Sequence, residues 1–130
     1  NPGISGVSIV QLNQPFQGVG QATRNTCIVS PGRSDRSPTG TGTCARMAVL
    51  RARGQMKVGD HMFHESIIGS RFKGTIAGET TIAGRPAILP RIEGRAWVTG
   101  FHSYCLDASD PYTQGYVIAD TWGVTGKLHQ

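Results

Sequence analysis

The sequence predicts an α+β domain in which a curled, mostly antiparallel sheet wraps around one central helix. Three observations support this prediction. Several β-rich runs are separated by glycine, one stretch near the middle has helical spacing, and no linker divides the chain. Its 130 residues are 38% hydrophobic, with 18 glycines and 7 prolines, which is the composition of one globular, turn-rich domain.

Two strands and a helix are expected in the first part of the chain. Residues 3–12 alternate branched and polar residues, and residues 22–32 form a second strand that Pro31 and Gly32 end. After a polar loop, residues 42–53 have the apolar spacing of a helix. Gly54 stands where a left-handed helix cap is expected.

After the helix we expect only strands and turns, with no parallel strand among them. The predicted strands fall within residues 61–69, 70–78, 79–94 and 95–106, and their glycine punctuation favours an antiparallel meander. Residues 121–130 are interpreted as a tail.

Charge and hydropathy narrow the classes of partner. The net charge is +5, and six basic residues lie between Arg33 and Lys57, where Asp35 is the only acid. We interpret this cluster as a solvated helix face, because it lacks the interleaved aromatics typical of a single-stranded nucleic-acid site. No apolar run is long enough to cross a bilayer, and no secretory leader is present. The chain begins without methionine and is expected to be processed or partial.

Cysteine and histidine patterns favour neither a disulfide framework nor a metal site. Cys27, Cys44 and Cys105 are odd in number and widely spaced, which favours a reducing, cytoplasmic compartment; each is interpreted as a packing residue. His61 and His64 are three apart in a predicted strand, so they are expected on opposite faces. His102 is interpreted as structural, and no metal or other cofactor is expected.

The stretch SDRSPTGTGTCARMAVLRARG, residues 34–54, raises the question of an anion site. Residues 40–45 formally match the dinucleotide fingerprint G-x-G-x-x-A, but no strand runs directly into them, and no Gly-Lys-Ser/Thr completes a P-loop. A helix N-terminus with glycines can still hold a carboxylate or a phosphate. Asp35 would then bind a cationic group of the same ligand. A glycine-rich helix start with Asp35 serving a turn explains the spacing equally well.

The same residues resemble a known family. DRSPTGTGT is similar to the signature D-R-S-P-C-G-T-G-T of the proline racemase family, and HESIIGSRFKGTI, GRAWVTGFHSYCLDASDPYTQGY and TRNTCIV extend the resemblance over nearly the whole chain. The resemblance implies a diaminopimelate-epimerase-like fold of two α+β domains with the active site between them. It also implies that residues 1–130 form the C-terminal portion of a longer enzyme, whose other catalytic residue lies outside this chain.

The resemblance further implies roles for four residues. Asp35 would bind the ring nitrogen of an imino acid, and the backbone N–H groups of Gly40 and Thr41 would bind its carboxylate. Thr39 stands where racemases and epimerases place their second catalytic cysteine. Val29, six residues before Asp35, replaces an aromatic wall that some racemases carry.

Thr39 bears directly on the mechanism. Inversion at Cα needs a base on one face and an acid on the other, and thiols suit both roles because their pKa can be tuned toward neutrality. A threonine hydroxyl is a poor base at pH 7, whereas elimination needs only one base. Within the family, threonine here resembles the trans-3-hydroxy-L-proline dehydratases, so we expect a cofactor-free hydro-lyase that gives Δ1-pyrroline-2-carboxylate.

Two alternatives stay open beside the dehydratase. One is a 4-hydroxyproline epimerase or proline racemase, and the other is a non-catalytic imino-acid-binding domain. A small imino acid and the missing part of the enzyme are the expected partners, with neither nucleic acid nor membrane. Whether the protein forms a homodimer is not decided by the sequence.

Overall fold

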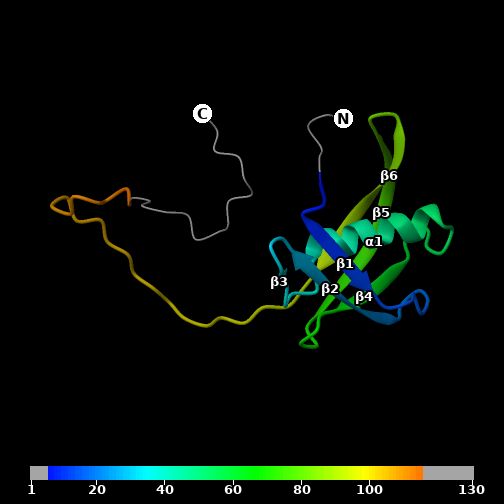
Figure 1. Ribbon diagram of the computed structural model, residues 1–130, viewed down its shortest axis with the longest axis horizontal. Coiled ribbons are helices and arrows are strands. Elements are labelled where there is room, and N and C mark those ends of the chain that lie inside the picture. Colours follow the sequence, from blue (N-terminus) through cyan, green and yellow to red (C-terminus); the bar gives the residue numbers. More distant parts are fainter. Residues whose placement is uncertain (1–5, 116–130) are drawn as a thin grey trace. The chain divides into compact units, whose positions relative to one another are not determined.

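A computed structural model describes residues 6–115 of the chain. They divide into two compact units, the first ending at Ala96 and the second beginning at Trp97. The first unit contains all the regular elements (Figure 1). In chain order these are β1 (Ile9–Asn13), β2 (Ala22–Val29), β3 (Arg33–Ser34), α1 (Gly40–Ala52), β4 (His61–Glu65), β5 (Arg71–Ile82) and β6 (Arg85–Glu93). One helix lies against a mostly antiparallel sheet, so the predicted α+β class is confirmed.

The sheet has the strand order β1-β2-β4-β5-β6, with the short β3 paired to β2. One expectation about it was wrong. β4 follows the helix and pairs in parallel with β2, with Thr23 opposite His64. The chain therefore makes a β2–α1–β4 crossover, which needs a connection of this length. This crossover is what carries α1 from one strand to the next and brings its N-terminus beside the end of β2.

The strands after the helix form the antiparallel meander that the sequence predicts. β4 pairs with β5, and β5 pairs with β6 through a hairpin closed by Ala83 and Gly84. Both hairpin residues have positive φ, as a tight turn compatible with strand twist requires. The strand predicted within residues 95–106 was wrong, because these residues contain no strand. The first strand also begins later than expected, at Ile9 rather than residue 3.

The helix begins at Gly40, two residues before the predicted start. Glycine has a low helix propensity, which hides such a start in the sequence. The C-terminal end agrees with expectation. Gly54 has φ of 71° and donates to the carbonyl of Arg51, and Gln55 donates to the carbonyl of Leu50.

The core lies between α1 and the sheet and contains all three methionines of the sequence. Met47 and Leu50 from the helix pack with Met56, Met62 and Ile76. At Gly74 of β5, an added Cβ would lie 2.9 Å from the sulfur of Met47 and 3.0 Å from the Thr43 methyl. Glycine at this position lets the helix approach the sheet closely, which fixes the height of its N-terminal turn.

A nearly buried carboxylate joins three strands at one edge of this core. Glu65 on β4 accepts from Arg24 of β2 and Arg71 of β5, each at 2.7 Å. These hydrogen bonds, to Arg24 and then to Arg71, lower the pKa of the Glu65 carboxyl. Glu65, the residue next to His64, is thereby bound to the strands on both sides of β4.

The second unit is described over residues 97–115, which contain turns and irregular backbone. Asp107 accepts from the backbone and hydroxyl of Ser109, and these bonds lower the pKa of the Asp107 carboxyl. Cys105 and His102 are exposed here, so the interpretation of Cys105 as a packing residue was wrong. The predicted tail, residues 121–130, lies outside the described residues.

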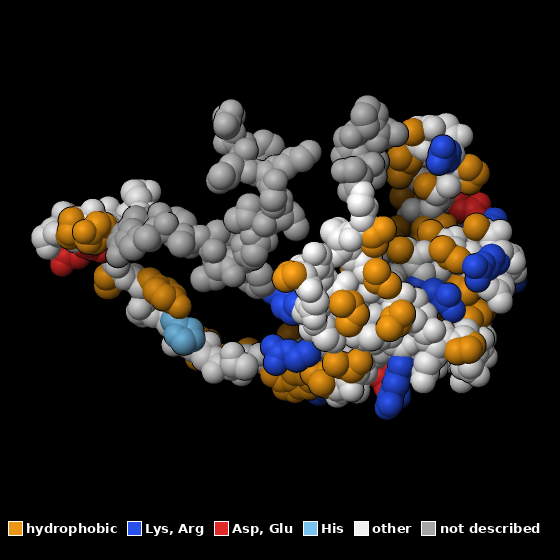
Figure 2. Space-filling view, viewed as in Figure 1, with side chains coloured by type: hydrophobic (Ala, Val, Ile, Leu, Met, Phe, Trp, Pro, Cys, Tyr) orange, Lys and Arg blue, Asp and Glu red, His pale blue; other side chains and the backbone are white. Residues whose placement is uncertain are grey.

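Basic side chains do not gather into one patch on the face shown in Figure 2. There the Lys and Arg side chains of the first unit are separated by apolar and uncharged surface. Several pair with acids, including Arg24, Arg51, Arg71 and Lys73. Of these four, only Arg51 belongs to the cluster between Arg33 and Lys57, so the interpretation of that cluster as a solvated helix face stays a prediction. Among the described residues, no helix has the length and apolar character needed to cross a membrane.

Candidate active site

A pocket of about 450 Å³ lies at the N-terminal end of α1 and brings together all four predicted site residues. Its lining also includes the apolar residues Ile9, Cys27 and Val29 from β1 and β2. Val29 thus lines the pocket, at the position where the resemblance places an aromatic wall in some racemases. A lining that combines a carboxylate and backbone donors with apolar side chains suits a small zwitterion that carries a hydrocarbon ring.

The first turn of the helix presents unsatisfied backbone donors to this pocket. Thr39, at the N-cap, makes no side-chain cap hydrogen bond, and the first turn has no acidic residue. In the described part of the chain, the first intrahelical bond runs from the N–H of Thr43 to the carbonyl of Thr39 at 3.0 Å. The N–H groups of Gly40 and Thr41 are thus left for a ligand, at the positive end of the helix dipole. This end of the helix can bind a carboxylate.

Thr39 has an unusual backbone conformation, with φ of 61° and ψ of 110°. A positive φ is rare for a β-branched residue and requires support from the surroundings. The support is visible: Thr39 is 7% exposed, its N–H donates to Ser37 Oγ at 3.1 Å, and its carbonyl accepts from Thr43. Strained residues of this kind cluster at functional sites.

Asp35 is held in place by Ser37, two residues along the chain. Its Oδ1 accepts from the Ser37 N–H at 2.9 Å, and its Oδ2 accepts from the Ser37 hydroxyl at 3.1 Å. Asp35 therefore serves a turn and lines the pocket at once, so the two sequence interpretations are compatible. Ser37 was not predicted, although the D-x-S spacing is a recognisable signal of such a turn.

The Thr39 hydroxyl contacts an amide and no acid–base group. Its Oγ1 donates to Oδ1 of Asn25 on β2 at 3.2 Å. Asn25 is buried, and its Nδ2 donates to the Pro38 carbonyl at 3.1 Å. An amide cannot accept the hydroxyl proton in catalysis, so these contacts do not turn Thr39 into a base.

Behind the helix start, Thr43 and His64 form a second, fully buried contact. Thr43 Oγ1 lies 2.6 Å from the Thr39 carbonyl oxygen and 2.8 Å from Nδ1 of His64. Burial, followed by the positive charge of Arg46, lowers the pKa of the His64 imidazole from 6.5 to about 4. His64 is thus neutral at pH 7. His61 lies on the opposite, half-buried face of β4, as predicted.

Gly42 and Gln11 complete the pocket. A Cβ on Gly42 would lie 2.6 Å from Thr39 Oγ1 and 2.7 Å from Gln11 Oε1. Position 42 consequently has no room for a side chain unless the pocket rearranges. This is the specific reason for the second glycine of the Gly-Thr-Gly-Thr run.

The cysteines of the first unit differ in their surroundings. Cys27 is 5% exposed and buried as predicted, and it also lines the pocket. Cys44 is only half-buried, so the expectation of a buried packing residue holds in part, and partial burial raises the pKa of its thiol. Cys44 does not line the pocket. Among the described residues, no group of three or more His, Cys, Asp or Glu side chains is arranged to hold a metal ion.

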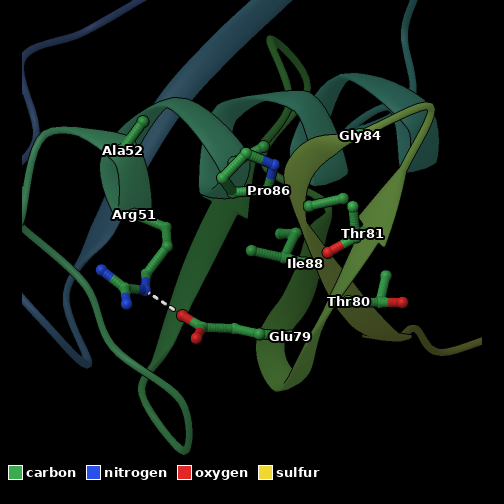
Figure 3. Close-up of a pocket in the computed structure, with 10 residues that line it drawn as sticks. Arg51, Ala52, Glu79, Thr80, Thr81, Gly84, Pro86 and Ile88 are labelled. Carbon is green, nitrogen blue, oxygen red and sulfur yellow. Dashed lines mark hydrogen bonds and ion pairs between the residues drawn. The ribbon is translucent and has the colours of Figure 1, made fainter.

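A larger cavity, of about 600 Å³, lies at the other end of the helix (Figure 3). It separates the last turns of α1 from the β5–β6 hairpin and is lined largely by small residues. Its charged groups, Arg51 and Glu79, bind each other across the cavity. None of the predicted site residues lies here, and the helix end offers no free donors, so the smaller pocket is the better candidate despite its volume.

Comparison with known proteins identifies the family of the chain. The family model described as proline racemase matches residues 1–117. The chain belongs to the proline racemase family. This membership confirms the resemblance based on the DRSPTGTGT stretch.

Two relatives of this proline racemase-family chain are named as hydroxyproline epimerases. The chain is 44% identical over 126 residues to a 4-hydroxyproline 2-epimerase of Allorhizobium ampelinum, covering 97% of this chain and 36% of that protein. It is 46% identical to a hydroxyproline epimerase from Agrobacterium vitis, solved with bound trans-4-hydroxy-L-proline, with a TM-score of 0.67 over 95% of this chain and 35% of that one.

A probable proline racemase from Agrobacterium radiobacter, solved with bound carbonate, gives the same TM-score of 0.67 at 44% identity, covering 94% of this chain and 35% of that one. The chain thus spans about a third of the length of the relatives it matches. These relatives are epimerases or racemases by name and give no support to the expectation of a dehydratase.

Proposed function

We propose that this chain supplies one face of an imino-acid site in an enzyme that removes the Cα proton of a hydroxyproline. The observation that carries the proposal is the shared pocket of Asp35, Thr39, Gly40 and Thr41 at an uncapped helix N-terminus. Asp35 binds the ring ammonium, and the N–H groups of Gly40 and Thr41 bind the carboxylate. The base for the opposite face of the substrate comes from outside residues 1–130.

These interactions favour deprotonation at Cα. Removal of the proton spreads negative charge onto the carboxylate, beside the helix N–H groups and the positive end of the dipole. Preorganised donors of this kind stabilise developing charge more strongly than they stabilise the ground state. The apolar wall of Ile9 and Val29 accommodates the ring carbons. No cofactor is needed for this chemistry.

The first candidate reaction is epimerisation of 4-hydroxyproline at C2. It is favoured by the relatives, one a 4-hydroxyproline 2-epimerase at 44% identity and one a hydroxyproline epimerase solved with trans-4-hydroxy-L-proline. Epimerisation requires a proton to be delivered on the second face of Cα. The Thr39 hydroxyl, bound to Asn25, needs either a water molecule or a further residue to serve that purpose.

The second candidate is dehydration of trans-3-hydroxy-L-proline, and Thr39 is the specific observation that favours it. Elimination needs one base, from the part of the enzyme outside this chain. It also needs an acid for the departing 3-hydroxyl, and a neutral hydroxyl can donate there without being a base at pH 7. The products are water and Δ1-pyrroline-2-carboxylate.

A substrate panel in D2O separates the candidates. The complete gene product that carries this chain is incubated with trans-4-hydroxy-L-proline, trans-3-hydroxy-L-proline and L-proline. Epimerisation gives the inverted product with deuterium at Cα, whereas dehydration consumes only the 3-hydroxy substrate and gives the cyclic imine. Binding of pyrrole-2-carboxylate without turnover of any substrate would indicate a non-catalytic binding domain. Absence of both binding and turnover would refute the proposal.

Thr39→Cys sharpens the same assay. A thiol at this position restores a group able to act as base and acid, so epimerisation is expected to rise by at least about tenfold while dehydration does not. Thr39→Ser, which keeps a hydroxyl of similar acidity, is the matched control and is expected to preserve the wild-type reaction. Equal epimerisation by all three proteins would show that residue 39 does not determine the reaction.

A further inference from the structure

A run of polar contacts, buried at Thr43 and His64 and ending at the exposed Asn13, joins the helix start to the sheet. Thr43 Oγ1 contacts the Thr39 carbonyl at 2.6 Å and His64 Nδ1 at 2.8 Å, and His64 Nε2 contacts the side-chain amide of Asn13 at 3.1 Å. Thr43 and His64 are both 0% exposed. The residues come from α1, β4 and β1, three elements distant in the sequence.

The single hydroxyl hydrogen of Thr43 determines where the imidazole proton lies. The Thr39 carbonyl can only accept, and so can the Pro38 carbonyl, 3.3 Å from the same hydroxyl. The Thr43 hydroxyl therefore donates to a carbonyl and must accept from His64, so the proton of the neutral ring is on Nδ1. Nε2 is then an acceptor. It faces Asn13 Oδ1, which also accepts from Gln11 Nε2 at 3.1 Å, so this tautomer requires the side-chain amides of Asn13 and Gln11 both to be turned end for end, an interchange that leaves every heavy atom in place.

The consequence for the ligand site follows from the planarity of the peptide bond. The Thr39 carbonyl and the Gly40 N–H belong to one peptide unit and point in opposite directions. The carbonyl is held by the Thr43 N–H at 3.0 Å and more closely by the Thr43 hydroxyl at 2.6 Å, and the two bonds together aim the Gly40 N–H away from the core, toward the pocket. The bond from the Thr43 hydroxyl adds to the contacts that hold Thr39 in its positive-φ conformation.

We propose that His64 is a positioning residue, acting through the Thr43 hydroxyl to aim the Gly40 N–H at the substrate carboxylate. His64 touches neither substrate nor reacting atoms, and the inference rests on the proposed carboxylate role of Gly40. It assigns a function to a histidine for which the sequence spacing predicted only a strand face opposite to that of His61.

The charged groups around His64 keep this arrangement neutral. Arg46, on the same helix as Thr43, opposes a second proton on the ring. Glu65, the next residue on β4, is engaged by Arg24 and Arg71. Phe72 of β5 is the paired residue on the other side and carries no charge. A protonated ring would donate through both nitrogens, and the turned Asn13 amide, with its NH2 group toward Nε2, could not accept the second proton.

The test uses two identical substitutions at buried threonines. Thr43→Val removes the hydroxyl that contacts His64. Thr23→Val makes the same change on β2, where Thr23 is 2% exposed and its hydroxyl has no hydrogen-bond partner among the described residues. In the complete gene product, Thr43→Val is expected to weaken binding of pyrrole-2-carboxylate by about tenfold and to raise KM similarly, because one carboxylate donor is misdirected. Thr23→Val is expected to change both by less than twofold.

Conservative variants give a second, independent comparison. Thr43→Ser keeps the hydroxyl and is expected to bind the analogue within twofold of wild type. His64→Asn places an amide donor near the position of Nδ1, whereas His64→Gln places it near Nε2, so the asparagine variant is expected to retain several-fold more affinity. If Thr43→Val fails to fold, the His64 pair still decides: equal affinity of the two variants overturns the proposal.

The imidazole tautomer is checked without any ligand. In ¹⁵N NMR of the complete gene product at pH 7, Nδ1 of His64 is expected to carry the proton and Nε2 to give the signal of an unprotonated nitrogen. A proton on Nε2 contradicts the proposal, as does wild-type affinity in Thr43→Val. Failure of the wild-type gene product to bind the analogue would instead refute the proposed function and leave the tautomer result standing.

Discussion

The two ends of α1 both border cavities, and the contrast between them shows why only one is a plausible active site. At the C-terminal end, the larger cavity has its two charges paired with each other, and the last carbonyls are capped by Gly54 and Gln55. At the N-terminal end, the smaller pocket has an uncapped turn and a carboxylate, Asp35, whose contacts are with Ser37. Unsatisfied donors and charge, rather than volume, distinguish the site.

Removing one carboxylate charge at each end of the helix is expected to give the largest difference in ligand binding. Asp35→Asn removes the proposed partner of the ring ammonium, and loss of a charged hydrogen bond should weaken pyrrole-2-carboxylate or substrate binding by about 10- to 100-fold. Glu79→Gln, the same change at the other end, is expected to leave binding within twofold. Calorimetric titration of the complete gene product measures both. Similar effects at the two ends would remove the basis for choosing the smaller pocket.

Filling the N-terminal pocket is the next test. Gly42→Ala places a Cβ within 3 Å of the Thr39 hydroxyl and the Gln11 amide, so the pocket must rearrange. We expect pyrrole-2-carboxylate to bind at least about tenfold more weakly. The free energy of unfolding is expected to fall by about 1–3 kcal/mol, as for other overpacked sites. Gly78→Ala is the control, because its Cβ meets Leu89 at an ordinary 3.4 Å. Normal binding by Gly42→Ala would mean that the ligand sits elsewhere.

Acidification should lower the free energy of unfolding, because His64 is buried as a neutral side chain behind the pocket. His64 has a folded pKa of about 4 against 6.5 when unfolded, so the unfolded chain binds more protons between these values. Stability is therefore full above pH 6.5 and is lost as the pH falls, by about 2 kcal/mol at pH 5 and at most about 3 kcal/mol by pH 4. Urea unfolding of the chain at pH 7 and pH 5 measures the loss.

His64→Asn is the control for the acid effect, because asparagine does not titrate. Its stability is expected to be lower at pH 7 but to change less between pH 7 and pH 5 than that of wild type. Below about pH 4.5, protonation of Glu65, whose pKa is lowered by its two arginines, adds a further loss in both proteins. An unchanged slope in His64→Asn would assign the acid sensitivity to other groups.

The sequence predicted the polar contents of the pocket better than the contacts that support it. Asp35, Thr39, Gly40 and Thr41 are close in sequence, so a local motif is enough to group them. Asn25 and His64 reach the same turn from β2 and β4, and the β2–α1–β4 crossover that brings them together was not expected. A parallel strand after the helix is also a feature of nucleotide-binding folds, so the argument against such a fold rests on the lack of a strand directly before the glycines.

Strand prediction failed where the pattern required packing that the described chain does not provide. Residues 95–106 have the β-branched and aromatic composition of a strand, but they have no ladder partner. Phe101 is 96% exposed. Composition favours a strand only where a neighbouring strand and a buried face exist, and neither can be deduced from the segment itself. The three-residue spacing of His61 and His64, by contrast, depends only on the strand period and was predicted correctly.

The smallest effect is expected at the C-terminal end of the helix, where the comparison began. Arg51 and Glu79 are 41% and 45% exposed, so solvent screens their attraction and each side chain loses rotamer entropy on pairing. Glu79→Gln should lower the free energy of unfolding by less than about 1 kcal/mol, and 1 M salt should remove most of the difference. Urea unfolding at low and high salt tests this. A larger, salt-independent loss of unfolding free energy would show that the Arg51–Glu79 pair holds the β5–β6 hairpin against the helix. The residues around that cavity would then contribute to stability.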